Sequence, residues 1–368
     1  MGNVRPHPSR PGRRAGIAAA LLAVLAACPG GGAPEGPATA PAAPPAPDVR
    51  PEPRPHAPAR LVSASRSVVD ALNLTGLSDL TASDDGKLWA VAERTRALVR
   101  MEADGTDVRL VPLAGVPVRL DVEGMAWLGS GRFALGTESD DPRRTSDLLL
   151  FARLVDGGAR ARVERSIVLD YGRWPLRPKG NQGLEGVCAA GPALVVAVES
   201  VSGTGSHRFA PVAVYHMASG GWTPYLVRLT SRTGKLSALS CLIRRGRGGA
   251  IDVLAVERHV GVARLVRFEL PAAGATPTAP VTTPAGRDRP PPARITPVLV
   301  ADLAELLQNQ ENFEGLVWDG ERDIALVVDN DWAGVTGPNL LVRARLSGPV
   351  PEPPPAPAPG SPLARPRR

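Results

Sequence analysis

Acidic residues recur at corresponding places along this sequence and form its largest set of chemically useful groups. Five short apolar runs each end in an acid or reach one near their end. These acids are Glu93, Glu138, Glu199, Glu257 and Asp329. Upstream of three of the runs stands a second acid that is followed by glycine, and these acids are Glu123, Glu185 and Glu314. Carboxylates gathered in one place raise one another's pKa or require a compensating cation.

A hard metal ion with oxygen ligands would compensate the acids, with Ca²⁺ as the first choice and Mg²⁺ as the second. The strongest metal-binding segment is Asp329-Asn330-Asp331, which carries three oxygen-bearing side chains in a row. An Asx-rich turn has the same composition and is the alternative interpretation. The predicted metal ligands are Asp329, Asp331, Glu314, Glu185 and Glu123.

Basic neighbours would also compensate the acids. Arg94 follows Glu93 directly, Arg258 follows Glu257, and Lys235 lies close to the same repeat. An opening lined by both acidic and basic side chains could bind a phosphate or carboxyl group beside a metal. The residues expected to bind such a substrate are Glu138, Glu199, Glu257, Arg258, Glu93 and Arg94. A structural role is the alternative, in which the acids accept backbone N–H groups or pair with arginines between strands.

Other catalytic motifs are absent from the sequence. It contains no Gly-x-Ser-x-Gly elbow, no HExxH, no phosphate loop and no paired CxxC. His207 and His259 lie in or near loops beside the acids and could act as a general base, although a lone loop histidine is usually only solvated.

The segments that carry the acids read as short β-strands separated by Gly, Asp, Pro and Arg turns. Each of the five repeats has a short first strand, a turn and a more apolar second strand, followed by a third strand. A fourth strand follows in every repeat except the last, and the strand-like residues 61–70 have no repeat of their own. The repeats predict an all-β fold, a β-propeller of four-stranded blades whose ring is closed by an N-terminal strand. Five blades are counted, and a sixth within residues 271–292 is the alternative.

This fold would bring the acids together. The first strand of a blade lines the central channel and the second returns antiparallel beside it, so the start of one and the end of the other lie on the same face. The repeated acids are therefore expected at one mouth of the channel.

Two cysteines lie at nearly equivalent places in successive repeats. Cys188 follows Glu185, and Cys241 follows Ser237, on the first strands of two neighbouring blades. An oxidising compartment would permit a disulfide between them. Two buried free thiols are the alternative, because neighbouring first strands could lie too far apart to bridge.

The ends of the chain predict export. Basic residues and an apolar run precede Leu25-Ala26-Ala27-Cys28, which resembles the lipobox of bacterial lipoproteins; in those proteins the cysteine is lipidated. We expect residues 1–27 to be a lipoprotein signal peptide, with an ordinary secretory signal as the alternative. Residues 28–60 should be a disordered Pro/Ala-rich tether, residues 61–348 the propeller domain, and residues 349–368 a disordered Pro-rich tail.

The formal net charge of +7 says little about partners, because several arginines lie in the predicted signal and tail. The body is nearly balanced, so nucleic acid is not an expected partner. We expect a monomer that contacts the membrane only through its lipid anchor, in the cell envelope, and that binds a small-molecule ester or another ligand.

Several short motifs resemble one bacterial family, the esterase-like domain of phytase. They are Leu184-Glu185-Gly186, Asn312-Phe313-Glu314-Gly315-Leu316, Val328-Asp329-Asn330-Asp331 and Leu254-Ala255-Val256-Glu257-Arg258. The resemblance implies a propeller, export, and hydrolysis of phosphate or other esters. The serines at 78 and 237, where the other repeats carry an inner acid, depart from the pattern.

Two functions follow. The first is a lipid-anchored, Ca²⁺-dependent hydrolase of phosphate or carboxylic esters that acts through a metal-bound water at the acidic mouth. The second is a non-catalytic propeller that binds a ligand or an envelope partner through the same face.

Overall fold

The computed structural model describes residues 58–71, 74, 76–93, 95–174, 176, 179–204, 207–243, 249–271, 291–304, 312–329, 337–348 and 350–354. All described elements belong to one compact unit, Pro55–Arg368. No helix among them is long and apolar enough to cross a membrane.

The described strands form antiparallel sets of four, as the repeats predict. The inner strands are β2 (Leu77–Ala82), β6 (Asp121–Trp127), β10 (Leu184–Ala190), β14 (Lys235–Ile243) and β19 (Asn312–Trp318). The second strands are β3 (Leu88–Ala92), β7 (Arg132–Glu138), β11 (Ala193–Val198), β15 (Ile251–His259) and β20 (Asp323–Asp329). The third strands are β4 (Ala97–Met101), β8 (Ser146–Val155), β12 (Phe209–His216), β16 (Val262–Leu270) and β21 (Leu340–Leu346). The outer strands are β5 (Arg109–Ala114), β9 (Arg160–Asp170), β13 (Gly221–Arg228), β18 (Val298–Asp302) and β1 (Leu61–Val68).

Three short elements complete the described structure. The strand β17 (Ala293–Ile295) pairs in parallel with β13. Two short 3-10 helices, η1 (Asp156–Gly158) and η2 (Tyr171–Arg173), flank β9. A parallel bridge between β5 and β9 joins the outer edges of the first two blades into one sheet.

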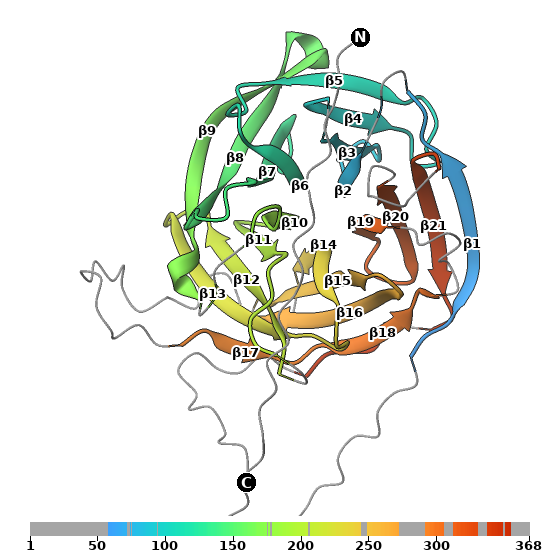
Figure 1. Ribbon diagram of the computed structural model, residues 1–368. Coiled ribbons are helices and arrows are strands. Elements are labelled where there is room, and N and C mark those ends of the chain that lie inside the picture. The colour runs from blue at the N-terminus through green and yellow to red at the C-terminus, as the bar shows by residue number, and fades with distance from the viewer. Residues whose placement is uncertain are drawn as a thin grey trace, which may run out of the picture. The chain divides into compact units, whose positions relative to one another are not determined.

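The blades surround a common centre and form a closed ring. The inner strands contact one another in the order β2, β6, β10, β14 and β19, and β19 contacts β2 again. Figure 1 shows β1 on the rim beside β21. These strands pair antiparallel from Leu61–Leu346 to Val68–Leu340, which confirms the predicted closure by an N-terminal strand. Most of the insert assigned to a sixth blade, residues 272–290, lies outside the described residues.

The core consists of apolar layers between neighbouring blades. One cluster contains Leu194 and Val196 of the third blade with Leu149 of the second, and another contains Val195 with Val253 and Phe268 of the fourth. Alternate side chains of a strand therefore pack against opposite neighbours, as a period of two requires. Gly124 and Gly315 permit close approach, because a Cβ on either would lie within 3 Å of the backbone of the next inner strand.

The structured region extends slightly beyond the predicted boundaries of 61–348. Ala59 donates its N–H to the carbonyl of Val300 at 2.7 Å. Val350 is buried in the cluster between the fourth and fifth blades, and its carbonyl accepts a hydrogen bond from Arg267. Residues 350–354, predicted as part of a disordered tail, therefore continue the fold.

Candidate functional site

Each inner strand carries a β-bulge near its start. One residue in each inner strand has no cross-strand partner. These residues are Asp79, Glu123, Glu185, Ser237 and Glu314. A bulge re-aims a side chain out of the regular alternation, so the repeat places four carboxyl groups and one hydroxyl around the ring.

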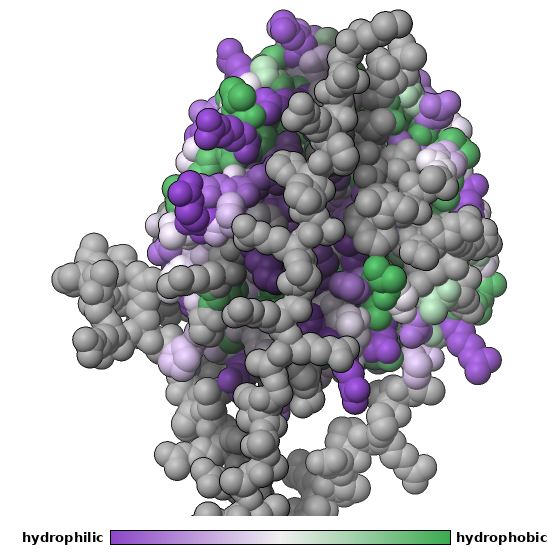
Figure 2. All heavy atoms as spheres, viewed as in Figure 1, coloured by the Kyte–Doolittle hydropathy of each residue, from purple (hydrophilic) through white to green (hydrophobic). Residues whose placement is uncertain are grey.

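The bulged glutamates join the acids at the ends of the second strands. We define the acidic mouth as seven carboxylates together with Arg258, Lys235, Ser78 and Asn312. The seven are Glu93, Glu123, Glu138, Glu185, Glu199, Glu314 and Asp329. Repulsion between them is substantial. Glu93, Glu185 and Glu138 raise the pKa of Glu123, and Asp329, Glu199 and Glu93 raise the pKa of Glu314. Hydrophilic side chains are visible near the centre of the face in Figure 2.

Ser78 connects two of these acids. Its hydroxyl contacts Glu93 and lies 2.9 Å from Oε2 of Glu123. A hydroxyl has one proton to donate, so a proton on one of the carboxyl groups would complete both hydrogen bonds. Burial, and then repulsion from Glu93, Glu185 and Glu138, raises the pKa of Glu123 well above its ordinary value. This direction agrees with a protonated Glu123.

Two basic residues neutralise one side of the mouth. Arg258 binds Glu314 with two guanidinium nitrogens, and its Nη2 lies 3.6 Å from Oε1 of Glu199. The ammonium of Lys235 forms an ion pair with the same oxygen of Glu199. Burial alone would lower the pKa of Arg258, but Glu314, Glu199 and Glu185 outweigh it and keep the guanidinium charged.

Asn312 fixes the geometry of two further acids. Its Nδ2 donates to Oε1 of Glu314 at 2.6 Å and to Oδ2 of Asp329 at 3.1 Å. Burial raises the pKa of Glu314 to about 8 against the opposing effect of Arg258. Glu314 and Asp329, two predicted metal ligands, are therefore bound to protein partners in this structure.

Glu185 and Glu138 have no ion pair to compensate their charge among the described residues, and the pKa of each is raised. Burial, and then repulsion from Glu199, Glu138 and Glu314, raises the pKa of Glu185 well above its ordinary value. Glu185 is 6% exposed, and within the described part of the chain its carboxylate accepts no hydrogen bond. Burial, and then Glu199, raises the pKa of Glu138 to about 7. Glu138 accepts one hydrogen bond, from the backbone N–H of Gly183 at 3.3 Å.

Glu257 differs from the other acids at the strand ends. It pairs with Leu236, and its carboxylate accepts four hydrogen bonds from the N–H and hydroxyl groups of Thr230 and Ser231. The following residue, Arg258, pairs with Lys235 and so occupies the strand-end place that Glu199 and Glu138 occupy in other blades. Glu257 thus holds the loop between β13 and β14, and Arg258 faces the other acids.

Asp79 is a structural residue that sequence reasoning overlooked. It is fully buried, with a φ of 46°, and Oδ2 accepts hydrogen bonds from the N–H groups of Met125 at 2.7 Å and Val187 at 3.0 Å. It therefore ties together the inner strands of three blades. The sequence did contain a signal for it. In the other four repeats the inner acid or Ser237 is followed by glycine or alanine, whereas Ser78 is followed by an acid.

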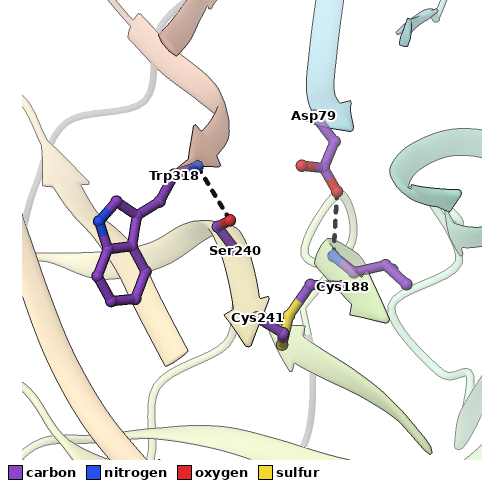
Figure 3. The surroundings of a disulfide bond; sticks show 6 residues. Asp79, Cys188, Ser240, Cys241 and Trp318 are labelled. Carbon is purple, nitrogen blue, oxygen red and sulfur yellow. Dashed lines mark hydrogen bonds between the residues drawn. A yellow bond between two sulfur atoms is a disulfide. The ribbon is translucent and has the colours of Figure 1, made fainter. Parts of the chain in front are cut away.

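Cys188 and Cys241 are bonded, with Cα atoms 5.5 Å apart, so the structure shows the disulfide alternative. Figure 3 shows the bond between β10 and β14, with Asp79 and Ser240 nearby. Ser240 accepts the N–H of Trp318 at 3.1 Å, which links the fourth blade to the fifth.

Three predicted functional residues lie outside the described residues: Cys28, Arg94 and Asp331. Among the residues that are described, no group of three or more His, Cys, Asp or Glu side chains has the geometry of a metal site. The donors at the mouth are carboxylate oxygens, which suit Ca²⁺ by type.

The fold and the site together define a β-propeller with a buried, strongly acidic channel mouth. A sequence profile described as the phytase-like family, with the esterase-like activity of phytase, matches residues 73–332. The chain belongs to this family. No curated protein matches the sequence.

Solved structures with similar backbones share little sequence with this chain. The allergen Mala s 1 of Malassezia sympodialis is 10% identical, with a TM-score of 0.43 over 76% of this chain and 95% of that chain. The PQQ-bound aldose sugar dehydrogenase of Streptomyces coelicolor is 11% identical, with a TM-score of 0.40 over 77% and 99%. A catalytically inactive virginiamycin B lyase of Staphylococcus aureus is 12% identical, with a TM-score of 0.36 over 77% and 100%.

Proposed function

We propose that this protein hydrolyses phosphate or carboxylic esters at the acidic mouth, with the help of a divalent cation, Ca²⁺ before Mg²⁺. One observation carries the proposal: Glu185, Glu123 and Glu138 are buried at a mouth that holds only two cationic side chains among its described residues, and Glu185 accepts no hydrogen bond there. Uncompensated carboxylates of this kind favour cation binding.

The ligand set differs from the one that the sequence predicts. Arg258 and Asn312 already bind Glu314 and Asp329, so Glu185 and Glu123 are the predicted ligands left to hold the cation. A bound cation would supply Lewis-acid activation of the ester and of water.

Two side chains support hydrolysis from the protein itself. The carboxyl of Glu138, with a pKa of about 7, can accept or release a proton near neutral pH, as a general acid or base requires. Lys235 is 23% exposed at the rim, where its ammonium can attract the anionic group of an ester.

The rival function is a non-catalytic propeller that binds a ligand through the same mouth. The ion pairs of Arg258 and Lys235 and the hydrogen bonds of Asn312 favour it, because they show that many of the charges already serve the fold. Under either function we propose export as a lipoprotein attached at Cys28, with the propeller acting as a monomer in the cell envelope.

A thermal melt combined with an ester assay distinguishes these functions. Ca²⁺ at 100 times its Kd should stabilise the parent by about 2.7 kcal/mol, several degrees in Tm, and a chelator should reverse the shift. Glu185→Gln should abolish the calcium response. Glu164→Gln, on an exposed outer strand, is the matched control and should keep it.

Hydrolysis of p-nitrophenyl phosphate or p-nitrophenyl acetate should depend on the same cation and on Glu138. If Ca²⁺ does not raise the melting temperature of the parent, the proposed role of the cation is wrong. A parent that binds calcium but turns over neither ester supports the binding function instead.

A further inference from the structure

A second cavity lies between the first two blades, at the opposite end of the ring from the acidic mouth. Its volume is about 870 Å³, within the range of about 300–1,000 Å³ that small-molecule sites occupy. Its wall includes the turns that follow β2 and β6, at Asp84 and Ser130, and Gly157 of η1. The acids of the mouth lie at the other ends of those inner strands, so the two sites are separate.

Two tryptophans form part of the cavity wall. The rings of Trp89 and Trp127 stack with centroids 6.3 Å apart and an interplanar angle of 17°. Phe133 packs edge-on against both rings, at 5.1 and 5.0 Å, and so holds them in place. Indole rings of this kind offer flat apolar surface together with a polar N–H.

One of the two indole N–H groups has no partner. Nε1 of Trp89 donates to Oγ of Ser83 at 3.2 Å. Nε1 of Trp127 is buried, and no hydrogen-bond acceptor lies near it in the described structure. A buried donor without a partner is uncommon in folded proteins, and this donor belongs to a residue of the cavity wall.

The charged residues of the wall are balanced in sign. Asp84, Asp85, Arg100 and Arg109 supply two carboxylates and two guanidinium groups. Arg109 is engaged by Asp107, and Asp85 accepts hydrogen bonds from Ser83 and Lys87. Asp84 has no hydrogen bond or ion pair to other described residues, and Nη2 of Arg100 lies 4.0 Å from Oδ2 of Asp85. A balanced site with free donors and acceptors favours a neutral ligand rich in hydrogen-bonding groups.

We propose that this cavity binds a neutral saccharide. The apolar C–H face of a sugar ring would pack on Trp127, Leu110 and Leu154, which are partly exposed, while its hydroxyls pair with Asp84 and Arg100. A hydroxyl both donates and accepts, so it satisfies a carboxylate and an N–H equally well. The proposal is independent of hydrolysis at the mouth, because none of its residues belongs to the mouth.

The walls of the cavity are fixed before a ligand arrives. The parallel bridge from Leu113 and Ala114 of β5 to Ala161 and Arg162 of β9 joins the two blades directly beside it. A preformed cavity avoids the cost of ordering on binding.

Saturation-transfer NMR of the full chain with cellotriose, maltotriose, mannotriose and chitotriose tests the proposal. We expect at least one trisaccharide to bind, with a Kd on the order of 0.1–1 mM. Trp127→Phe replaces the indole by a smaller ring, and the lost apolar contact with the sugar should weaken binding roughly 3- to 10-fold. Asp84→Asn, in an exposed turn where folding is not at risk, should weaken it by a similar factor.

Asp140→Asn removes an exposed acid elsewhere on the surface and should leave the saccharide Kd unchanged. If none of the four trisaccharides binds to the folded parent, the proposal is wrong. Binding that is equal in the parent, Trp127→Phe and Asp84→Asn would place the saccharide elsewhere and would also overturn it.

Discussion

Replacing Glu138 by glutamine should change how stability depends on pH. In the folded protein, burial and the neighbouring Glu199 raise the pKa of Glu138 from 4.5 to about 7. Glutamine has nearly the same shape and can still accept the N–H of Gly183, but it carries no ionisable proton. The substitution therefore isolates the cost of ionising a buried carboxyl group.

The sign follows from proton linkage. Between about pH 4.5 and 7 the folded protein retains a proton at Glu138 that the unfolded chain has released, so the free energy of unfolding falls as the pH rises through this interval. The contribution is fully present below pH 4.5 and is lost above pH 7. At about 1.4 kcal/mol per pH unit, the loss amounts to about 3 kcal/mol.

Neighbouring acids increase the effect. Glu138 is one of the carboxylates that raise the pKa of both Glu123 and Glu185, so its removal should lower their pKa values as well. The stability of Glu138→Gln should therefore fall less steeply with pH than that of the parent, by about 3 kcal/mol or more between pH 5 and 8.

Urea unfolding of both proteins at pH 5, 6, 7 and 8, with a common m value, measures the difference. Glu164→Gln serves as the control, because the Glu164 carboxylate is 41% exposed and pairs with Arg153 on the outer surface. Stability curves that run parallel for the parent and Glu138→Gln would refute the argument that the pKa of Glu138 is raised in the folded protein.

Three further predictions concern the ring and the anchor. Deleting residues 61–70 should expose the edge of β21 and cause aggregation, whereas deleting residues 29–57 should leave the melting temperature unchanged; equal melting of both would show that β1 is dispensable. Cys188→Ser should destabilise the protein by about 4 kcal/mol in urea, because the disulfide closes a loop of 53 residues, and the same loss should appear in the parent under reducing conditions. Cys28→Ser should release the protein from membranes in cell fractionation, because acyl chains are proposed to attach only there, and unchanged fractionation would remove the anchor.

The strand pattern and the closure of the ring could be predicted because their signals lie in short segments of the sequence. Alternating apolar residues mark the strands, and the last repeat lacks a fourth strand while residues 61–70 have no partner. Similarly, Glu185 and Glu199 are separated by nearly the same number of residues as Glu314 and Asp329. This similar spacing indicated that the acids meet at one end of the blades.

The register at individual strand ends could not be predicted in this way. Glu257 was aligned with the other acids because it ends an apolar run, but strand pairing places it one residue earlier and gives the equivalent position to Arg258. A shift of one residue moves a side chain to the opposite face of a strand. The local pattern of apolar residues does not contain this information, because the shift depends on where the bulge falls.

The partners of residues that connect blades could not be predicted, even where, as at Asp79, the sequence departs visibly from the repeat. Asp79 accepts N–H groups from β6 and β10, which are remote from it in the chain. The cavity beside Trp89 and Trp127 likewise requires the packing of the first blade against the second. Both features depend on the angle between neighbouring sheets, which no single repeat specifies.

The pairing of Leu61 with Leu346 sets the order of events during synthesis. The first strand to leave the ribosome is the partner of the last, so the fifth blade remains incomplete until nearly the whole chain has been made. Earlier blades can form as they emerge, but each intermediate leaves apolar layers and strand edges open to other chains. Contacts between such distant residues also form slowly. The fifth blade is therefore completed late, in the single step in which β21 pairs with β1.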